Sequence, residues 1–436
     1  MLTRRTVIRG MALGAAFAAG LPRTTSAQDS DGDLVARLRA DLERHASFGL
    51  KFSAGPGDAA TAGWVAGRLR EIGYAVEESE FPAPFFVQRA ARLTAGSASA
   101  TVHPQAPVVP TPPEGVTAPL ALVEDDARDV SGRIALFVAP FGRHAALFPN
   151  RGIGKTVREI AAAGARAVVV VTTGPTGEAI ALNAPEEPFV PIPAAILAPK
   201  DAGPFVEAAR AGRTATLVID GEATRRPSKN VVARLVRGRR WIVVSTPRSG
   251  WYHCVGERGT GTAAFLEMAA WARTRFPDLS VFLMNTGGHE YFFAGSHHVL
   301  GEAPPPEDTL AWAHIGAAIA TRDAVERDGR WVMLEEADPQ RSLMATEAAR
   351  AAAATAFAGL SGLSGLSEPT PVRPQAGELS TFTDRGYRAA FAVLGVHRWM
   401  HTMQDTLERV DARLLVPVLR AHQRTIELLV TAQERA

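Results

Sequence analysis

The feature that most constrains the fold is a buried-strand pattern that ends in two glycines. The run 281–286 is apolar enough for a central strand, and Gly287 and Gly288 break it immediately before His289 and Glu290. In an open α/β sheet, the carboxyl ends of the strands are where side chains meet a ligand. We therefore expect this imidazole and this carboxylate at a ligand-binding edge of a sheet.

From residue 230 onward, strand-like and helix-like segments alternate, as is typical of an α/β sandwich with a mostly parallel central sheet. The expected segments are 241–245, 262–276, 281–286, 310–319, 342–360, 388–394 and 411–432. A second imidazole, His401, follows more than a hundred residues after Glu290. Carboxylate and imidazole groups at such an edge are what zinc requires, so the pattern indicates a metallohydrolase or a descendant of one.

The middle of the chain has a different pattern. Residues 33–70 have the spacing of two helices, and 73–81 alternates like a strand that the prolines at 82–84 should end. Short β-like runs then follow at 133–138, 167–171 and 194–197, with one helix expected at 157–164. We predict a β-rich insertion at 87–224, a linker at 225–229, and a main domain built from 28–86 and 225–436. The alternative is that 87–224 continues one large sheet.

The N-terminus has the features of an export signal. Arg4 and Arg5 are adjacent, an apolar run covers 11–21, and small residues at 25–27 suit a cleavage site. This pattern predicts a twin-arginine signal at 1–27 and a periplasmic or secreted protein. The alternative, an uncleaved anchor, is disfavoured because a span needs about 20 apolar residues. After cleavage we expect no stable membrane anchor.

Composition excludes several other classes. With 46% hydrophobic and 21% charged residues among 436, the chain can bury a large core in about two or three domains. A net charge of +2 is too small to predict nucleic-acid binding, and one cysteine excludes an internal disulfide framework. A peptide or small carboxylate-bearing partner is the expectation that remains. The oligomeric state and the preferred substrate terminus are not specified by the pattern.

Five motifs resemble, in order, those of the di-zinc exopeptidases, which include the aminopeptidases of peptidase family M28 and the transferrin receptor. They are Asn230-Val-Val-Ala233, Trp241-Ile-Val-Val-Ser245, the stretch 256–267 that begins Gly-Glu-Arg-Gly-Thr-Gly, Gly288-His-Glu290 and His401-Thr-Met-Gln-Asp-Thr406. The resemblance covers most of the mature chain. It implies a three-layer α/β sandwich in which residues 87–224 form a protease-associated domain.

The chemistry of this chain departs from the family pattern. The family has a His-x-Asp motif after the second strand, whereas residues 245–249 read Ser-Thr-Pro-Arg-Ser, so a ligand histidine is missing. The Asp-Asn pair of the family falls on Glu257 and Arg258, its Glu-Glu pair on His289 and Glu290, and its later Asp on His314, while His401 matches plainly. The resemblance then implies one zinc, held by Glu257, Glu290 and His401, because the second site lacks ligands.

The remaining candidate residues are open to more than one interpretation. The resemblance places His289 at the position of the family's general base, but this residue is also a candidate metal ligand or a core histidine. His314 is a candidate nitrogen ligand. Arg248 and Arg258 are absent from the family pattern. One interpretation is that the two arginines bind a carboxylate of the substrate, and Arg258 is then also a candidate for a catalytic role. The other is that they form ion pairs with Glu257 and Glu290 inside the protein, without any metal.

The function implied by the resemblance is hydrolysis of a peptide or related amide bond by metal-activated water. A catalytically inactive binding protein of the same fold is the alternative. A serine hydrolase is disfavoured because the sequence has no Gly-x-Ser-x-Gly elbow.

Overall fold

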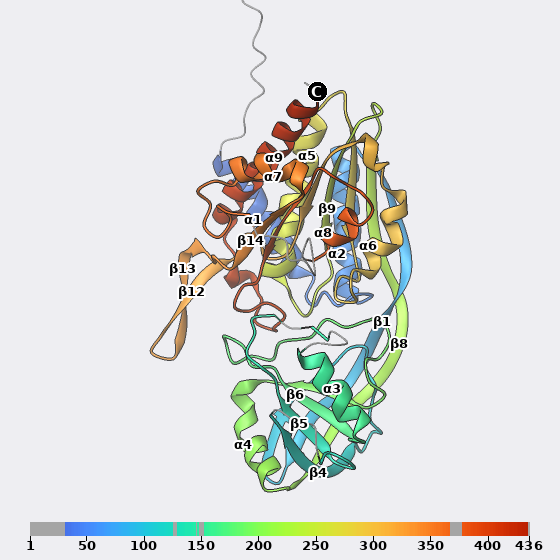
Figure 1. Ribbon diagram of the computed structural model, residues 1–436, viewed down its shortest axis with the longest axis vertical. Helices are drawn as coiled ribbons and strands as arrows, with labels where there is room; N and C mark the ends of the chain where they lie inside the picture. Colours follow the sequence, from blue (N-terminus) through green and yellow to red (C-terminus); the bar gives the residue numbers. More distant parts are fainter. Residues whose placement is uncertain (1–30, 125–128, 145, 148–151, 367–376, 435–436) are drawn as a thin grey trace, which may run out of the picture.

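The computed structural model describes residues 31–124, 129–144, 146–147, 152–366 and 377–434. They form two lobes joined by two long strands (Figure 1). These strands are β1 (Ala75–Ala95) and β8 (Thr214–Leu235), which pair antiparallel along most of their length. The predicted signal, 1–27, lies outside the described residues. None of the helices in the described ranges combines the length and apolar character needed to cross a bilayer.

The larger lobe is built on the central part of one extended sheet. Its strands are β9 (Trp241–Pro247), β10 (Ser280–Thr286), β11 (Thr309–Ile315), β14 (Arg341–Ala345) and β15 (Ala390–Gly395). Their order is β14-β15-β11-β9-β10-β8. Strands β15, β11, β9 and β10 run parallel, while β14 and β8 are antiparallel to their neighbours. Almost every residue of β9, β10 and β11 is buried, as expected for parallel strands covered on both faces.

Helices cover both faces of this sheet. One face carries α1 (Asp31–Ser47), α2 (Pro56–Ile72), α5 (Thr260–Arg275), α7 (Glu347–Ala356) and α9 (Ala412–Glu434). The other carries the short helices α6 (Ala294–Val299) and α8 (Leu379–Thr383). Ile242 and Val244 of β9 pack on the first side and Val243 on the second, because successive strand side chains point to opposite faces. The three-layer α/β sandwich predicted from the sequence is therefore confirmed.

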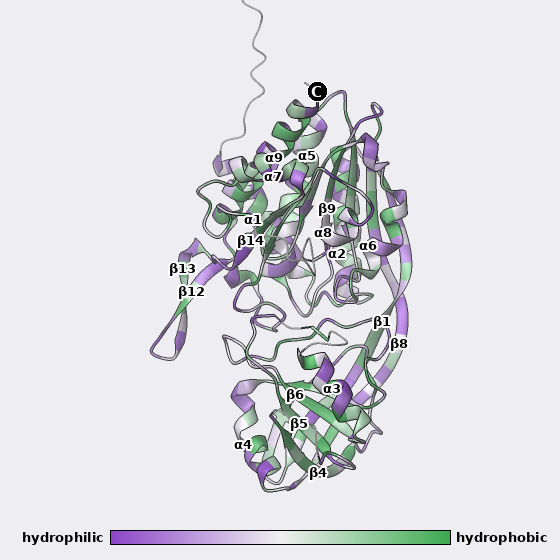
Figure 2. Ribbon diagram, in the orientation of Figure 1, coloured by the Kyte–Doolittle hydropathy of each residue, from purple (hydrophilic) through white to green (hydrophobic). Residues whose placement is uncertain are grey.

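The smaller lobe continues the same sheet. Its strands are β2 (Ala98–Thr101), β3 (His103–Pro104), β4 (Val116–Val123), β5 (Ile134–Val138), β6 (Ala167–Val171) and β7 (Ala194–Leu197), and its helices are α3 (Gly152–Ala162) and α4 (Pro199–Arg210). Apolar residues of β4, β5 and β6 form its core (Figure 2). The elements of this lobe lie within residues 87–224, the range predicted as an insertion, together with the adjoining parts of β1 and β8, and β8 links them into one 13-stranded sheet. The boundaries of the insertion stay a prediction. Its kinship with protease-associated domains stays a prediction.

The predictions for the stretch between the lobes were wrong in two places. The strand does not end at residues 82–84, and 225–229 is not a linker, because Phe81 pairs with Ser228 and Pro84 with Arg225 inside the β1–β8 ribbon. Pro82 lies opposite Pro227, so the two prolines meet in a two-stranded ribbon where few ladder hydrogen bonds are lost. The ribbon is hydrophilic where it crosses between the lobes (Figure 2).

A hairpin was also missed. Strands β12 (Arg322–Arg327) and β13 (Arg330–Ala337) pair only with each other and project from the larger lobe (Figure 1). The segment predicted at 310–319 is a strand that ends at Ile315. The segment predicted at 342–360 consists of two elements, β14 and α7.

Candidate functional site

Glu257 and Arg258 lie on a π-helical turn, Val255–Gly259, that leads directly into α5. The carboxylate of Asp405 accepts hydrogen bonds from the backbone N–H groups of Gly256 and Glu257, at 2.7 and 3.0 Å. A carboxylate at this end of a helix satisfies otherwise unpaired N–H groups and is favoured by the helix dipole. Asp405 therefore fixes the turn that presents Glu257.

Glu290 follows the carboxyl end of β10. Its Oε2 accepts hydrogen bonds from the hydroxyls of Ser53 and Ser249, at 3.0 and 2.8 Å. The preceding Gly287 allows the chain to pass closely, because a Cβ there would lie 2.6 Å from Ser228 Oγ. The sequence thus places Glu290 at the expected sheet edge, with its carboxylate turned inward.

The guanidinium of Arg258 lies between the two glutamates. Its Nη2 is 2.8 Å from Glu257 Oε1 and 3.8 Å from Glu290 Oε1, and its Nε donates to the carbonyl of Ser249 at 2.8 Å. All three charged side chains are 0 to 1% exposed. Burial raises the pKa of Glu257, but the charges of Arg258 and His401 outweigh burial and hold this pKa well below its usual range. Glu257 is therefore an ionised partner of Arg258.

His401 joins the same cluster from the C-terminal part of the chain. Its Nε2 lies 3.1 Å from Glu257 Oε1 and its Nδ1 lies 3.0 Å from the carbonyl oxygen of Ala181. The backbone N–H of Ala181 donates in return to the carbonyl of His401, at 2.9 Å, and that of Ala184 donates to the carbonyl of Glu290, at 3.1 Å. A loop of the smaller lobe thus holds both residues in place.

A second cluster centres on Glu378, a residue that sequence reasoning did not identify. Its Oε2 lies 3.1 Å from His289 Nδ1 and 3.5 Å from His314 Nε2, and the hydroxyl of Ser296 bonds to its Oε1. Burial raises the pKa of Glu378, but the hydrogen bond and charge of His289, with His314 and Ser296, lower it to about 2. The carboxylate is ionised and accepts hydrogen bonds from its neighbours.

The hydrogen bonds around His314 fix the roles of its ring nitrogens. The indole of Trp312 donates to Ser245 Oγ at 2.8 Å, and because the ionised Glu378 can only accept from Nε2 of His314, Nδ1 of the neutral ring accepts from the Ser245 hydroxyl at 2.9 Å. The other nitrogen, Nε2–H, then faces Glu378. Burial lowers the pKa of His314 to about 4, so the ring is neutral near pH 7. Both nitrogens are occupied, and the predicted ligand role of His314 finds no support.

The second cluster lies at the wall of a cavity of about 620 Å³. His289, His314 and Glu378 line it from the larger lobe, and His144 and Asn183 line it from the smaller lobe. The side chain of His289 is 12% exposed, and its Nδ1 faces Glu378. In the tautomer that donates Nδ1–H to this carboxylate, Nε2 has a lone pair that can accept a proton. The fully buried Glu257, Arg258 and Glu290 lie apart from this lining.

Arg248 belongs to neither of these two clusters and forms its own set of contacts. Its Nε is 2.8 Å from Asp58 Oδ1, its Nη1 donates to Asn285 Oδ1 at 3.0 Å, and its Nη2 donates to the carbonyl of Lys229 at 2.5 Å. The side chain is 0% exposed. These surroundings do not support the predicted substrate contact, nor a pair between Arg248 and a glutamate. Arg248 neutralises Asp58 instead.

The predicted zinc does not fit the arrangement of its expected ligands. Glu257, Glu290 and His401 do converge, as the order of the motifs implied, but the guanidinium of Arg258 lies between the two carboxylates. Within the described ranges, no group of three or more His, Cys, Asp or Glu side chains is arranged to hold a metal ion. The alternative of internal neutralisation describes Arg258 better than contact with a substrate or a catalytic role.

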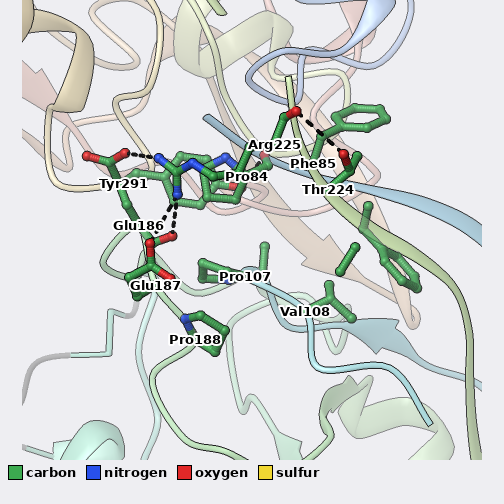
Figure 3. A pocket seen from close by; sticks show the side chains of 13 residues that line it. Pro84, Phe85, Pro107, Val108, Glu186, Glu187, Pro188, Thr224, Arg225 and Tyr291 are labelled. Atoms are coloured by element: carbon green, nitrogen blue, oxygen red, sulfur yellow. Dashed lines mark hydrogen bonds and ion pairs between the residues drawn. The ribbon is translucent and has the colours of Figure 1, made fainter. Parts of the chain in front are cut away.

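Another cavity, of about 360 Å³, lies where the β1–β8 ribbon meets the smaller lobe (Figure 3). Pro84, Phe85 and Tyr291 contribute to an apolar lining. Arg225 at its edge pairs with Glu186 at 2.7 Å and with Glu187 at 3.3 Å. Because these charged groups pair with one another, the cavity offers an apolar surface rather than an acid–base site.

The fold is a three-layer α/β sandwich with a cleft between its two lobes. No protein-family model and no curated protein sequence matches the chain. Solved structures do match it. An aminopeptidase from Aneurinibacillus sp. strain AM-1 is 17% identical with a TM-score of 0.61, over 91% of this chain and 93% of that one. The zinc aminopeptidase BSAP from Bacillus subtilis is 16% identical with a TM-score of 0.68, over 91% and 95% of the two chains.

A Peptidase M28 precursor from Shewanella amazonensis SB2B is 14% identical with a TM-score of 0.67, again over 91% and 95% of the chains. Identities this low concern the fold alone. The chain therefore has the fold of the M28 zinc exopeptidases, which confirms the fold that the motif resemblance implied.

Proposed function

We propose that this protein hydrolyses a peptide or related amide bond in the cleft between its lobes, with His289 as general base. The observation that carries the proposal is the 3.1 Å contact between His289 Nδ1 and the buried carboxylate of Glu378, at the wall of a 620 Å³ cavity. A carboxylate behind an imidazole fixes its tautomer and stabilises the imidazolium that forms when the ring takes a proton. The aminopeptidases among the structural neighbours support this substrate class.

The chemistry follows from the hydrogen bonds. Nε2 of His289 takes a proton from water as the water attacks the substrate carbonyl, and the same nitrogen returns the proton to the leaving amine. Glu378 stabilises the charged ring, and neutral His314 keeps Glu378 in position. The step does not include the single zinc expected from the motifs, because Arg258 lies between two of its three expected ligands.

A catalytically inactive binding protein is the second candidate. The observation that favours it is the neutralisation of Glu257 and Glu290 by a buried guanidinium, which leaves both carboxylates turned away from the cleft. In that case the cleft binds a peptide or a small carboxylate-bearing ligand without cleaving it. Binding without turnover distinguishes this candidate from the first.

The test is a panel of model peptides with free N-termini or free C-termini, incubated with the mature protein. We expect turnover of at least one peptide at a rate that a zinc chelator leaves unchanged, because the proposed base is an imidazole. A zinc aminopeptidase of the same fold serves as the chelator-sensitive control. Turnover that disappears with chelator and returns with zinc would contradict the mechanism. Calorimetric binding of peptides without turnover would support the second candidate.

We also propose that the protein is exported by the twin-arginine route, on the basis of Arg4 and Arg5 ahead of a mildly apolar run. Replacing both by lysine is expected to retain the full-length precursor in the cytoplasm. Fractionation and immunoblotting measure this. The matched control is Arg9→Lys, which changes a nearby arginine and leaves the pair intact. Normal export of the double variant would exclude this route.

A further inference from the structure

Beneath the cleft, four ionisable side chains form a closed cluster. Glu257, Arg258, Glu290 and His401 are each 0 to 1% exposed. Two carboxylates buried this deeply require a cation, because an isolated buried charge is very unfavourable. Arg258 is within 4 Å of both carboxylates, and its guanidinium supplies the positive charge.

The contacts of Arg258 show how it is held. Only its Nε forms a directed hydrogen bond, to the carbonyl of Ser249 at 2.8 Å. In the described part of the chain, Glu257 Oε2, Glu290 Oε1 and both terminal nitrogens of Arg258 have no hydrogen-bond partner. The guanidinium therefore faces the carboxylates mainly as a charge, and not as the bidentate fork that arginine usually offers a carboxylate. A spherical cation would satisfy the same oxygens.

We infer that Arg258 is the resident cation of this cluster and occupies the place where Glu257, Glu290 and His401 would otherwise hold a divalent metal ion. Two carboxylates and one imidazole form a three-ligand set that suits zinc, and His401 Nε2 already lies 3.1 Å from Glu257 Oε1. The native protein accordingly binds no zinc here, and removal of Arg258 creates a zinc site. The inference does not depend on whether the cleft hydrolyses peptides.

Arg248 provides the internal comparison. It is as deeply buried as Arg258, but its guanidinium bonds to Asp58, Asn285 and the backbone of Lys229. Of these two arginines, Arg258 is the one that lies close to two carboxylates. Gaining a metal site is therefore expected from substitutions at position 258 and not at position 248.

The first experiment uses the native mature protein. It is dialysed against zinc, freed of excess ion, and its zinc content is measured by elemental analysis beside that of Glu290→Gln and His401→Ala. We expect the native protein and both variants to have the same zinc content, so that no bound zinc depends on Glu290 or His401. Adding zinc should not change the melting temperature of the native protein. Native protein that holds about one zinc, lost in both variants, would overturn the inference.

The second experiment creates the site. Arg258→Ala is expected to bind about one zinc per chain and to gain melting temperature when zinc is added, because an ion that binds only the folded state stabilises it. The double variant Arg258→Ala/Glu290→Gln should lose this zinc, and Arg258→Lys should never gain it. Cobalt provides a spectroscopic readout of the same site. If zinc neither binds to Arg258→Ala nor helps it to fold, the inference is wrong.

Discussion

Replacing Arg248 by alanine is expected to lower the free energy of unfolding by about 3–5 kcal/mol, the usual cost of breaking a fully buried ion pair. The substitution leaves Asp58 buried without its cation, and it removes the donors to Asn285 and to the Lys229 carbonyl. Urea denaturation followed by circular dichroism measures the change. Substrate selectivity should stay the same, because Arg248 is 0% exposed.

A surface pair provides the control for this prediction. The side chain of Arg275 is 51% exposed and lies 2.8 Å from Glu427. Arg275→Ala should change the free energy of unfolding by less than about 1 kcal/mol. If Arg248→Ala were as stable as the native protein but raised KM for carboxylate-bearing peptides alone, the substrate contact expected from the sequence would be correct.

The second large effect concerns catalysis. His289→Ala is expected to lower kcat by about 10²- to 10⁴-fold, the range for removal of a general base. Glu378→Gln keeps the shape of the side chain but removes the charge that stabilises the imidazolium, so kcat should again fall more than KM changes. Steady-state kinetics on the best peptide of the panel, with melting temperatures of each variant, separate catalytic loss from unfolding.

His297 provides a matched control within the same cavity. It lines the cleft and is exposed on α6. His297→Ala should keep kcat close to the native value. An equal loss in His289→Ala and His297→Ala would point to general disturbance of the cleft, and undiminished activity of His289→Ala would exclude the proposed base.

Much of the fold could be predicted from the sequence. The segments 167–171 and 194–197 are short, strongly apolar runs, and both are strands with these limits in the structure. The strand was wrongly predicted to end at the prolines of 82–84. How many ladder hydrogen bonds a proline removes depends on the residue opposite it, and Pro227, which lies opposite Pro82, also lacks an N–H. The hairpin of β12 and β13 was missed because, in its two strands, Ala324 is the one buried residue, so neither strand has the alternating buried pattern of a core strand.

The candidate site could be predicted only in outline. The order of the motifs brought Glu257, Glu290 and His401 together, but side-chain direction could not be inferred. Neighbouring residues of an α-helix point about 100° apart, so a contact between Glu257 and Arg258 is not expected in a regular helix. The π-helical turn at Val255–Gly259 changes these directions. Glu378 lies in no motif, and Asp58 is 190 positions from Arg248 in the chain, so neither partner could be recognised.

The loop of the smaller lobe at Ala181 and Ala184 has a mechanical consequence. Its backbone bonds directly to His401 and to Glu290, and these two residues belong to the buried cluster of the larger lobe. A rotation of one lobe about the β1–β8 ribbon would stretch these bonds at the same time as it widened the cleft. Any opening of this kind would therefore also disturb the buried charges, because these bonds tie the loop of the smaller lobe to two members of the buried cluster.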